Sequence, residues 1–142
     1  MPASFAYRPP DTPRVTDSDL AEPALSELPI LDTRPLNDLL DLGGSSGLVH
    51  ELIALFQEDV PVRLSILKAA LEAADAPQAM MEAHQLKGSL SNMGLVRFAD
   101  LVSRIESRAR EGQVEKVPGI AEIFSTSYEE AIHALKTAYP QD

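Results

Sequence analysis

The chain has 142 residues, with 12 Lys or Arg against 22 Asp or Glu and a formal net charge of −10. This length suits one domain, and a hydrophobic share of 44% argues against wholesale disorder. The acidic balance argues against a nucleic-acid binder, whose affinity depends on Lys and Arg. Cysteine is absent, which excludes disulfides and cysteine metal sites and fits a cytoplasmic protein. No apolar run approaches the roughly 20 residues that cross a bilayer, so we expect no membrane association.

Residues 1–30 are predicted to be a flexible, proline-rich tail. Six of the eleven prolines fall within the first 29 residues. Proline lacks a backbone donor and disfavours helix in the residue before it. The few apolar residues of this stretch show no period, so we expect neither helix nor sheet there. The folded domain is predicted to span residues 31–139.

The rest of the chain has helical periodicity, and no run of alternating β-branched residues indicates a strand. A short helix is predicted over residues 33–42, and four long amphipathic helices are predicted at about 46–74, 77–93, 95–111 and 116–139. Short links between long helices favour antiparallel neighbours. The predicted fold is therefore all-α, an up-and-down antiparallel four-helix bundle with a short additional N-terminal helix.

Two of the long helices carry a clear apolar face. The first has apolar residues at spacings of three and four, namely Val49, Leu52, Ile53, Phe56, Val60, Leu64, Leu67 and Leu71. Pro61 interrupts this helix, and because the stripe resumes in register we expect a kink rather than a break. On the next helix, the face predicted to pack into the bundle consists of Ala79, Ala83, Leu86, Leu90 and Met93.

The predicted helix over residues 77–93 also carries a histidine, a lysine one turn later and an interior glycine. At about 100° per residue, His84 lies roughly 140° from the centre of the packed face, so its side chain is predicted to point outward. The residues within about 60° of it are Met80, Met81, Lys87, Gly88 and Ser91.

The chemistry of these residue types suits phosphoryl transfer. An exposed imidazole without an acidic neighbour is largely neutral at pH 7, which leaves one nitrogen lone pair available as a nucleophile. We expect no carboxylate near the ring, because Glu82 projects from another side of the helix. Lys87 would attract an anion attached to the ring. Gly88 costs about 1 kcal/mol relative to Ala inside a helix, but it leaves space for phosphoryl oxygens and for the protein that delivers them.

At this stretch the sequence resembles a known family. HQLKGSLSNMG at residues 84–94 is similar to the signature of histidine-containing phosphotransfer (Hpt) domains, approximately H-x-L-K-G-S-[SA]-x-x-x-G. Upstream, LDTRPLNDLLDLGGSSGLVHELIALFQEDVP resembles the family's first helix, glycine turn and long second helix. Downstream, LVRFADLVSRIESRAR resembles its leucines followed by L-E-x-x-G-R. Leu90 stands where the family has Ser or Ala, and Ala109 replaces the glycine of the downstream pattern.

The resemblance implies a module of a multistep two-component phosphorelay, with receiver domains or a hybrid sensor kinase as partners. It implies that His84 carries the phosphoryl group, that Lys87 helps to hold it and that Gly88 gives clearance. The receiver would supply the acidic pocket and Mg²⁺, and this monomeric chain would bind no cofactor. No Walker-type or kinase nucleotide-binding signature is present, so we expect a phosphotransfer intermediate rather than an autonomous enzyme.

Partner contact is predicted at four residues around the histidine, because methionine adapts to several partners. These residues are Met80, Met81, Gln85 and Ser91.

A polar residue of the fourth helix often supports the phosphohistidine in relatives, but the sequence does not identify it here. Ser103 and Arg104 lie near the region and match no motif position. The arginines closest to the end of that helix, such as Arg110, are assigned to complementing the helix dipole.

Several alternatives stay open at this stage. The chain could be a non-catalytic adaptor or structural bundle that docks a receiver-like partner. A metal-binding bundle would use His50, His84 and His133, which fall on three helices, although no Glu-x-x-His repeat accompanies them. A hydrolytic enzyme is disfavoured because no paired carboxylates stand out. The sequence does not distinguish a free-standing shuttle from a fragment of a hybrid kinase.

Overall fold

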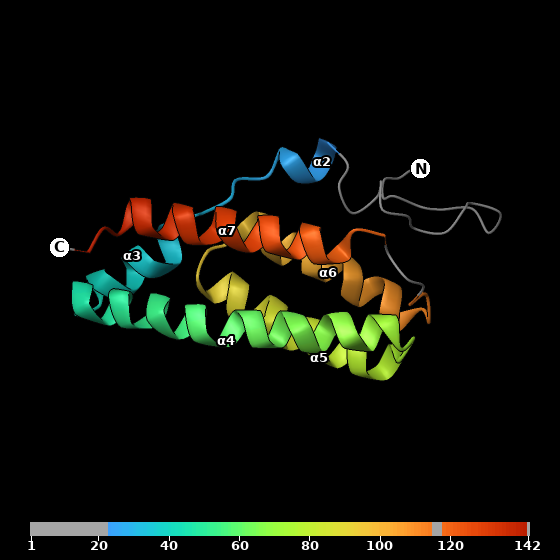
Figure 1. Cartoon of the computed structure of the whole chain (residues 1–142). Helices are drawn as coiled ribbons and strands as arrows, with labels where there is room; N and C mark the ends of the chain where they lie inside the picture. The colour runs from blue at the N-terminus through green and yellow to red at the C-terminus, as the bar shows by residue number, and fades with distance from the viewer. Residues whose placement is uncertain (1–22, 115–117, 142) are drawn as a thin grey trace.

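The computed structural model describes residues 23–114 and 118–141 (Figure 1). Its elements are α2 (Pro23–Ser26), α3 (Arg34–Asp41), α4 (Ser46–Glu72), α5 (Ala76–Asn92), α6 (Val96–Arg110) and α7 (Ile120–Ala138). Successive long helices from α4 to α7 run in opposite directions, and α3 lies where α4 begins and α7 ends (Figure 1). These residues contain no strand. The predicted all-α bundle with a short additional helix is confirmed.

Helices α3 to α6 begin and end within two residues of their predicted bounds. Helix α7 differs, because it begins at Ile120 rather than near Lys116, which lies outside the described residues. Gly119, directly before α7, has a φ of 74°. This left-handed conformation is incompatible with a helix running through the residue, so the helix begins after it.

The predicted apolar stripes form the core of the bundle. The stripe of α4 is buried except for Leu52, which is half-buried and packs against the same core. The predicted inner face of α5 is buried in full, with Leu86 and Leu90 at 0% exposure. Each such leucine stabilises the fold by about 1.5–3 kcal/mol. The most extensive helix pairing is between α5 and α6, so the helix that carries His84 is held mainly by α6.

Helix α4 continues through Pro61 without a break, as expected. Proline has no N–H, so the carbonyl of Gln57, four residues earlier, loses its helical partner. The hydroxyl of Tyr128 on α7 donates a hydrogen bond to this carbonyl at 3.5 Å. The Tyr128 ring also stacks on Phe56 with a centroid separation of 6.0 Å, and burial raises the pKa of the Tyr128 hydroxyl. Helix α7 therefore satisfies the backbone group that the proline leaves unpaired.

The end of the predicted tail is folded. Helix α2 lies within residues 1–30, where no helix was expected, and the side chain of Leu25 is only 8% exposed. The expectation for residues 1–22 concerns positions outside the described residues. For residues 23–30 the absence of helix and packing was a wrong prediction.

The reason lies in contacts with α6. The Arg97 side chain donates hydrogen bonds to the carbonyl oxygens of Ser26 at 2.9 Å and Leu28 at 2.7 Å. The backbone N–H of Arg97 donates to the Pro29 carbonyl at 3.1 Å. A proline residue has no backbone N–H, but its carbonyl oxygen can still accept a hydrogen bond. In this segment Arg97 of α6 donates the hydrogen bonds that the carbonyl oxygens accept.

A second close contact joins the start of the domain to the turn between α5 and α6. The Asp32 N–H donates to the Gly94 carbonyl at 2.7 Å. Gly94 has a φ of 81°, and a Cβ at this position would collide with the Asp32 carbonyl oxygen. Only glycine allows both the left-handed turn and this backbone approach. The predicted helix stop therefore also fastens the segment before α3 onto the site-bearing helix pair.

No helix in the described part of the chain is both long and apolar enough to span a membrane.

The contact between Tyr128 and the backbone at Pro61 is testable. Tyr128→Phe should lower the free energy of unfolding by about 0.5–1.5 kcal/mol, because the Gln57 carbonyl loses its donor. In a Pro61→Ala background the new N–H supplies a donor to that carbonyl, so the same substitution should cost less. Urea unfolding of the four proteins, followed by circular dichroism, measures this coupling. An equal cost in both backgrounds would contradict the assigned role.

Candidate functional site

His84 lies on the outer face of α5. Its side chain is 68% exposed, whereas Ala83 and Leu86 on the opposite face are fully buried. The outward orientation predicted from helical projection is therefore confirmed. The ring is supported by a neighbouring helix rather than by α5 itself.

Glu106 of α6 provides that support. Its Oε2 lies 3.0 Å from His84 Nδ1 and 2.8 Å from Arg110 Nη2, and its Oε1 lies 2.8 Å from Lys87 Nζ. The Glu106 side chain is only 2% exposed, while those of Lys87 and Arg110 are 34% and 59% exposed. One buried carboxylate thus holds three side chains that reach the surface.

This contact corrects the expectation that no carboxylate lies near the ring. Glu82 is indeed turned toward α4, where its Oε1 lies 3.9 Å from Nη1 of Arg63. The acid that reaches His84 is 22 positions later in the chain. Helical projection compares only residues of one helix, so it cannot identify a hydrogen-bond partner on a neighbouring helix.

A sequence signal for Glu106 did exist. Glu106 lies four residues after Val102 and three before Ala109, both of which are buried. It therefore falls within the apolar stripe of α6, where a charged residue needs a partner. It also occupies the acidic position of the L-E-x-x-G-R pattern. Glu106 is thus the polar residue of α6 that contacts His84.

The electrostatics of this cluster define the tautomer of the ring. Burial by itself raises the pKa of the Glu106 carboxyl, but hydrogen bonds from Lys87, His84 and Arg110 lower it below its usual range. The carboxylate is therefore ionised at pH 7 and can only accept hydrogen bonds. Nδ1 of His84 must then carry the proton, and in the neutral ring the lone pair resides on Nε2.

Gly88 occupies open space on the outer face of α5. Apart from its chain neighbours and the backbone of its own helix, a Cβ at this position would have no atom within 4 Å. Internal packing therefore does not explain a glycine that costs about 1 kcal/mol in a helix. The open position is compatible with the predicted clearance for an incoming molecule.

The four predicted contact residues differ in their surroundings. Met81 is 47% exposed, whereas Met80 is half-buried and packs against the core. Gln85 is exposed, and its Oε1 accepts a hydrogen bond from Nη1 of Arg63 on α4 at 3.0 Å. Ser91 is exposed and borders two hollows, one toward α4 and one toward α6. Of these four residues, Met80 is thus the one whose side chain packs against the core of the bundle.

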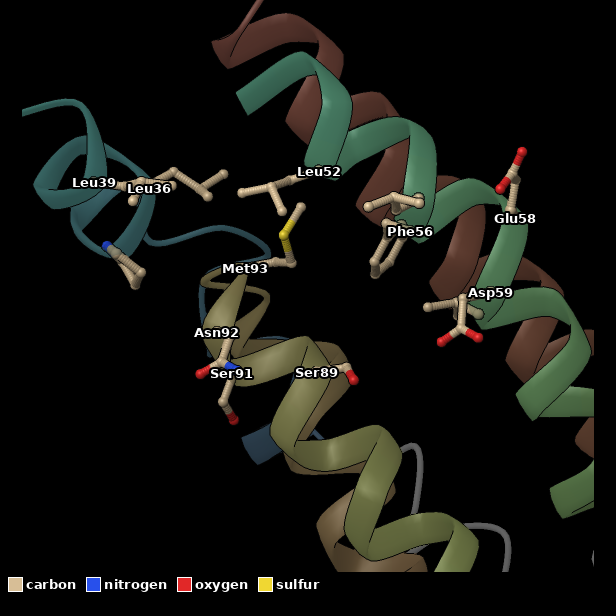
Figure 2. A pocket seen from close by; sticks show the side chains of 13 residues that line it. Leu36, Leu39, Leu52, Phe56, Glu58, Asp59, Ser89, Ser91, Asn92 and Met93 are labelled. Atoms are coloured by element: carbon tan, nitrogen blue, oxygen red, sulfur yellow. The ribbon is translucent and has the colours of Figure 1, made fainter. Parts of the chain in front are cut away.

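An apolar groove lies between α3, α4 and α5, with a volume of about 920 Å³. Figure 2 shows Leu39 of α3, Leu52 and Phe56 of α4, and Met93 around the same space. Its polar lining includes Glu58, Asp59, Ser89, Ser91 and Asn92. The sequence did not predict this groove. The available signal was Leu55, an apolar residue outside the stripe of α4 that is 55% exposed and lines the groove.

None of the remaining candidates is part of the hydrogen-bonded cluster of Glu106 with His84, Lys87 and Arg110. Arg104 pairs with Asp100 at 2.9 Å, and Ser103 borders the small hollow next to Lys87. His50 contacts the Pro140 carbonyl oxygen at 3.1 Å. Among residues 23–114 and 118–141, no group of three His, Asp or Glu side chains is arranged to hold a metal ion.

The Glu106 cluster predicts a pH-dependent contribution to stability. Because the pKa of Glu106 is lowered in the folded state, its contribution is fully present above the ordinary value of 4.5 and is lost as the pH falls toward the folded value. The difference in unfolding free energy between the wild type and Glu106→Gln should therefore shrink as the pH falls below 4.5. Urea unfolding at several pH values measures this difference, and a constant difference would contradict the assignment.

Comparison with known proteins adds independent evidence. The family model described as "Hpt domain" matches residues 51–141. The crystal structure of histidine-containing phosphotransfer protein B (HptB) from Pseudomonas aeruginosa PAO1 is similar, with a TM-score of 0.62 and 30% sequence identity. This similarity covers 80% of the present chain and 96% of the HptB chain. A search of curated proteins gave no match.

Proposed function

The chain belongs to the Hpt domain family, which acts in histidine phosphotransfer, and we propose that His84 is the residue that accepts and passes on the phosphoryl group. The observation that carries this proposal is the exposed ring whose Nδ1 is held by a buried carboxylate at 3.0 Å. This arrangement presents Nε2 as the nucleophile in a defined orientation. An exposed histidine without such support would rotate freely and sample both tautomers.

The proposed reaction is in-line transfer from an aspartyl phosphate of a receiver domain. The Nε2 lone pair of His84 attacks phosphorus, the Nε2–P bond forms, and the P–O bond to the aspartate breaks with its electron pair leaving on the carboxylate. The proton on Nδ1 stays in place, so the phosphorylated ring is cationic. The negative charge of Glu106 stabilises this cation directly. The reverse steps return the phosphoryl group to a receiver.

Lys87 and Gly88 complete the proposed site. Lys87 Nζ is anchored to Glu106 Oε1 and partly exposed, so its positive charge lies close to the ring and offsets charge on the transferred oxygens. The open space at Gly88 gives the receiver clearance to approach. We assign Mg²⁺ to the receiver and regard this chain as a carrier of the group rather than an autonomous enzyme.

The apolar groove is the proposed docking surface for the receiver. The groove lies at the C-terminal end of α5, the helix that carries His84. Leu55 is an exposed apolar side chain that lines the groove, and Met81 is an exposed apolar side chain three residues before His84. Burying such side chains against a partner is favourable, whereas leaving them in water is not. We propose this surface in addition to the predicted contact residues Met80, Met81, Gln85 and Ser91, of which Ser91 also lines the groove.

Phosphate labelling tests the assignment of His84. Wild-type protein mixed with phosphorylated receiver domains should acquire an acid-labile, alkali-stable phosphate, and ³¹P NMR should place it on Nε2. His84→Gln should acquire none. His133→Gln, which removes another exposed histidine, should be labelled normally.

Two results would oppose the proposal. Equal labelling of His84→Gln would assign the chemistry to another residue. Receiver binding without labelling of the wild type would favour the adaptor alternative.

A charge in the groove tests the docking surface. Leu55→Glu should reduce the apparent second-order rate constant of transfer about tenfold, because an anchoring apolar contact becomes charged. Val62→Glu is the matched control, since Val62 is 57% exposed on the same helix and does not line the groove. Rapid-mixing transfer assays measure both variants. An equal loss in both would argue against the groove as the specific contact.

A further inference from the structure

Helix α4 carries a second row of apolar side chains on its outer face. Leu55, Val62 and Ile66 are exposed by 55%, 57% and 40%. At about 100° per residue they lie within about 40° of one another and roughly 140° from the centre of the buried stripe of the same helix. A helix at the surface of a bundle needs only one apolar face. Packing within the chain therefore does not explain the second row.

The spacing of this row is that of a coiled-coil seam. From Leu52 to Ala69 its positions alternate between steps of three and four residues, as the a and d positions of a heptad repeat do. We call this row the outer stripe; it consists of Leu52, Leu55, Asp59, Val62, Ile66 and Ala69. Leu52 is half-buried and the other five residues are exposed. Such a pattern is typical of a helix that packs along a second helix.

The outer stripe is complementary to itself when two copies of α4 run antiparallel. In one register every residue of the stripe faces another residue of the stripe in the second copy. The facing pairs are Leu52 with Ala69, Leu55 with Ile66, and Asp59 with Val62. A large side chain thus faces a small one at each end, which allows the helices to approach closely. A parallel pair would instead place the carboxylates of both Asp59 residues opposite each other, which is unfavourable.

The charges at the centre of this register are also complementary. Nε of Arg63 lies 2.7 Å from Oδ2 of Asp59 in the same helix, and these side chains are 34% and 53% exposed. Arg63 directly follows Val62, the residue that faces Asp59 of the second copy. The antiparallel pair therefore brings two carboxylates and two guanidinium groups together around one two-fold axis. Exposed ion pairs add little affinity, but they favour one orientation over others.

We propose that the outer stripe of α4 is an interface for a second copy of this chain, which pairs through an antiparallel, two-fold symmetric contact of the two α4 helices. The contact is one helix wide, so the interface is small and the pairing weak. At low concentration the chain is then the monomer that the family resemblance implies. The proposal does not depend on the role of His84.

The proposed contact also overlaps the apolar groove. Leu52, Leu55 and Asp59 belong to the outer stripe and line the groove as well. A second copy bound along α4 would cover this side of the groove. Self-association and occupation of the groove by another protein would therefore exclude each other.

Sedimentation equilibrium of the full-length protein tests the pairing. The wild type should show a reversible monomer–dimer equilibrium, and Val62→Glu should raise its Kd at least about tenfold because a charge enters the apolar contact. Ala54→Glu is the matched control, since it adds the same charge at an exposed position of α4 outside the stripe. Each chain carries a net charge of −10, so raising the salt from about 0.05 M to about 0.5 M should strengthen the dimer by screening this repulsion.

Disulfide cross-linking tests the register, because the natural chain contains no cysteine. A mixture of Leu55→Cys and Ile66→Cys should form a disulfide-linked dimer under mild oxidation, since these positions face each other. Either variant alone should form little, because the two copies of each position are separated by 11 helical residues, or about 16 Å along the axis.

A concentration-dependent dimer that is lost in Val62→Glu, kept in Ala54→Glu and cross-linked only in the mixture would support the inference. A monomer at every concentration, or an equal loss in both glutamate variants, would overturn it. Equal cross-linking of each cysteine variant alone would overturn the antiparallel pairing. Phosphate labelling of His84 tests the proposed function separately, so the failure of one leaves the other standing.

Discussion

The site depends on one buried carboxylate. Placing an ionised glutamate in a protein interior is strongly unfavourable unless charged donors compensate for the lost water. Glu106 receives that compensation from His84, Lys87 and Arg110, all of which reach it from the surface. The same contacts that satisfy the buried acid orient the exposed ring. Internal stability and external reactivity therefore share one set of interactions.

The fold keeps this carboxylate in position through the packing of α5 against α6. The segment before α3 adds contacts to this helix pair. Arg97 donates hydrogen bonds to the carbonyl oxygens of Ser26 and Leu28, and the Gly94 carbonyl accepts one from the N–H of Asp32. The prolines before α3 do not prevent this order, since their carbonyl groups remain free to accept. A segment without regular periodicity thus becomes part of the support for α6.

The surface of α5 combines two chemically different regions along one helix. His84 and its cations form a polar region at the middle of α5, and the groove near Met93 forms an apolar one at its C-terminal end. In the proposed complex a receiver fills the groove and also reaches the ring, so that affinity and chemistry come from separate residues. This separation allows docking contacts to change without altering the reacting atoms.

Local periodicity was sufficient for much of the architecture. The apolar stripe of α4, the inner face of α5 and the outward position of His84 all follow from the angular spacing of residues on a single helix. The interruption at Pro61 was also readable, because the stripe resumed in register. The resemblance carried by HQLKGSLSNMG then pointed to the family that the comparison shows.

Contacts between different helices could not be predicted from the periodicity of single helices. Glu106 meets His84 only because α5 and α6 pack in one particular register. Helix α2 is held by the burial of Leu25 and by the hydrogen bond from Arg97 of α6 to the Ser26 carbonyl. Likewise, the groove arises from the separation of three helices rather than from any one of them. The apolar periodicity of the sequence indicates which side of each helix is buried. The rotation and offset of one helix against the next depend on how side chains of both interlock, and these two quantities placed the acid beside the imidazole.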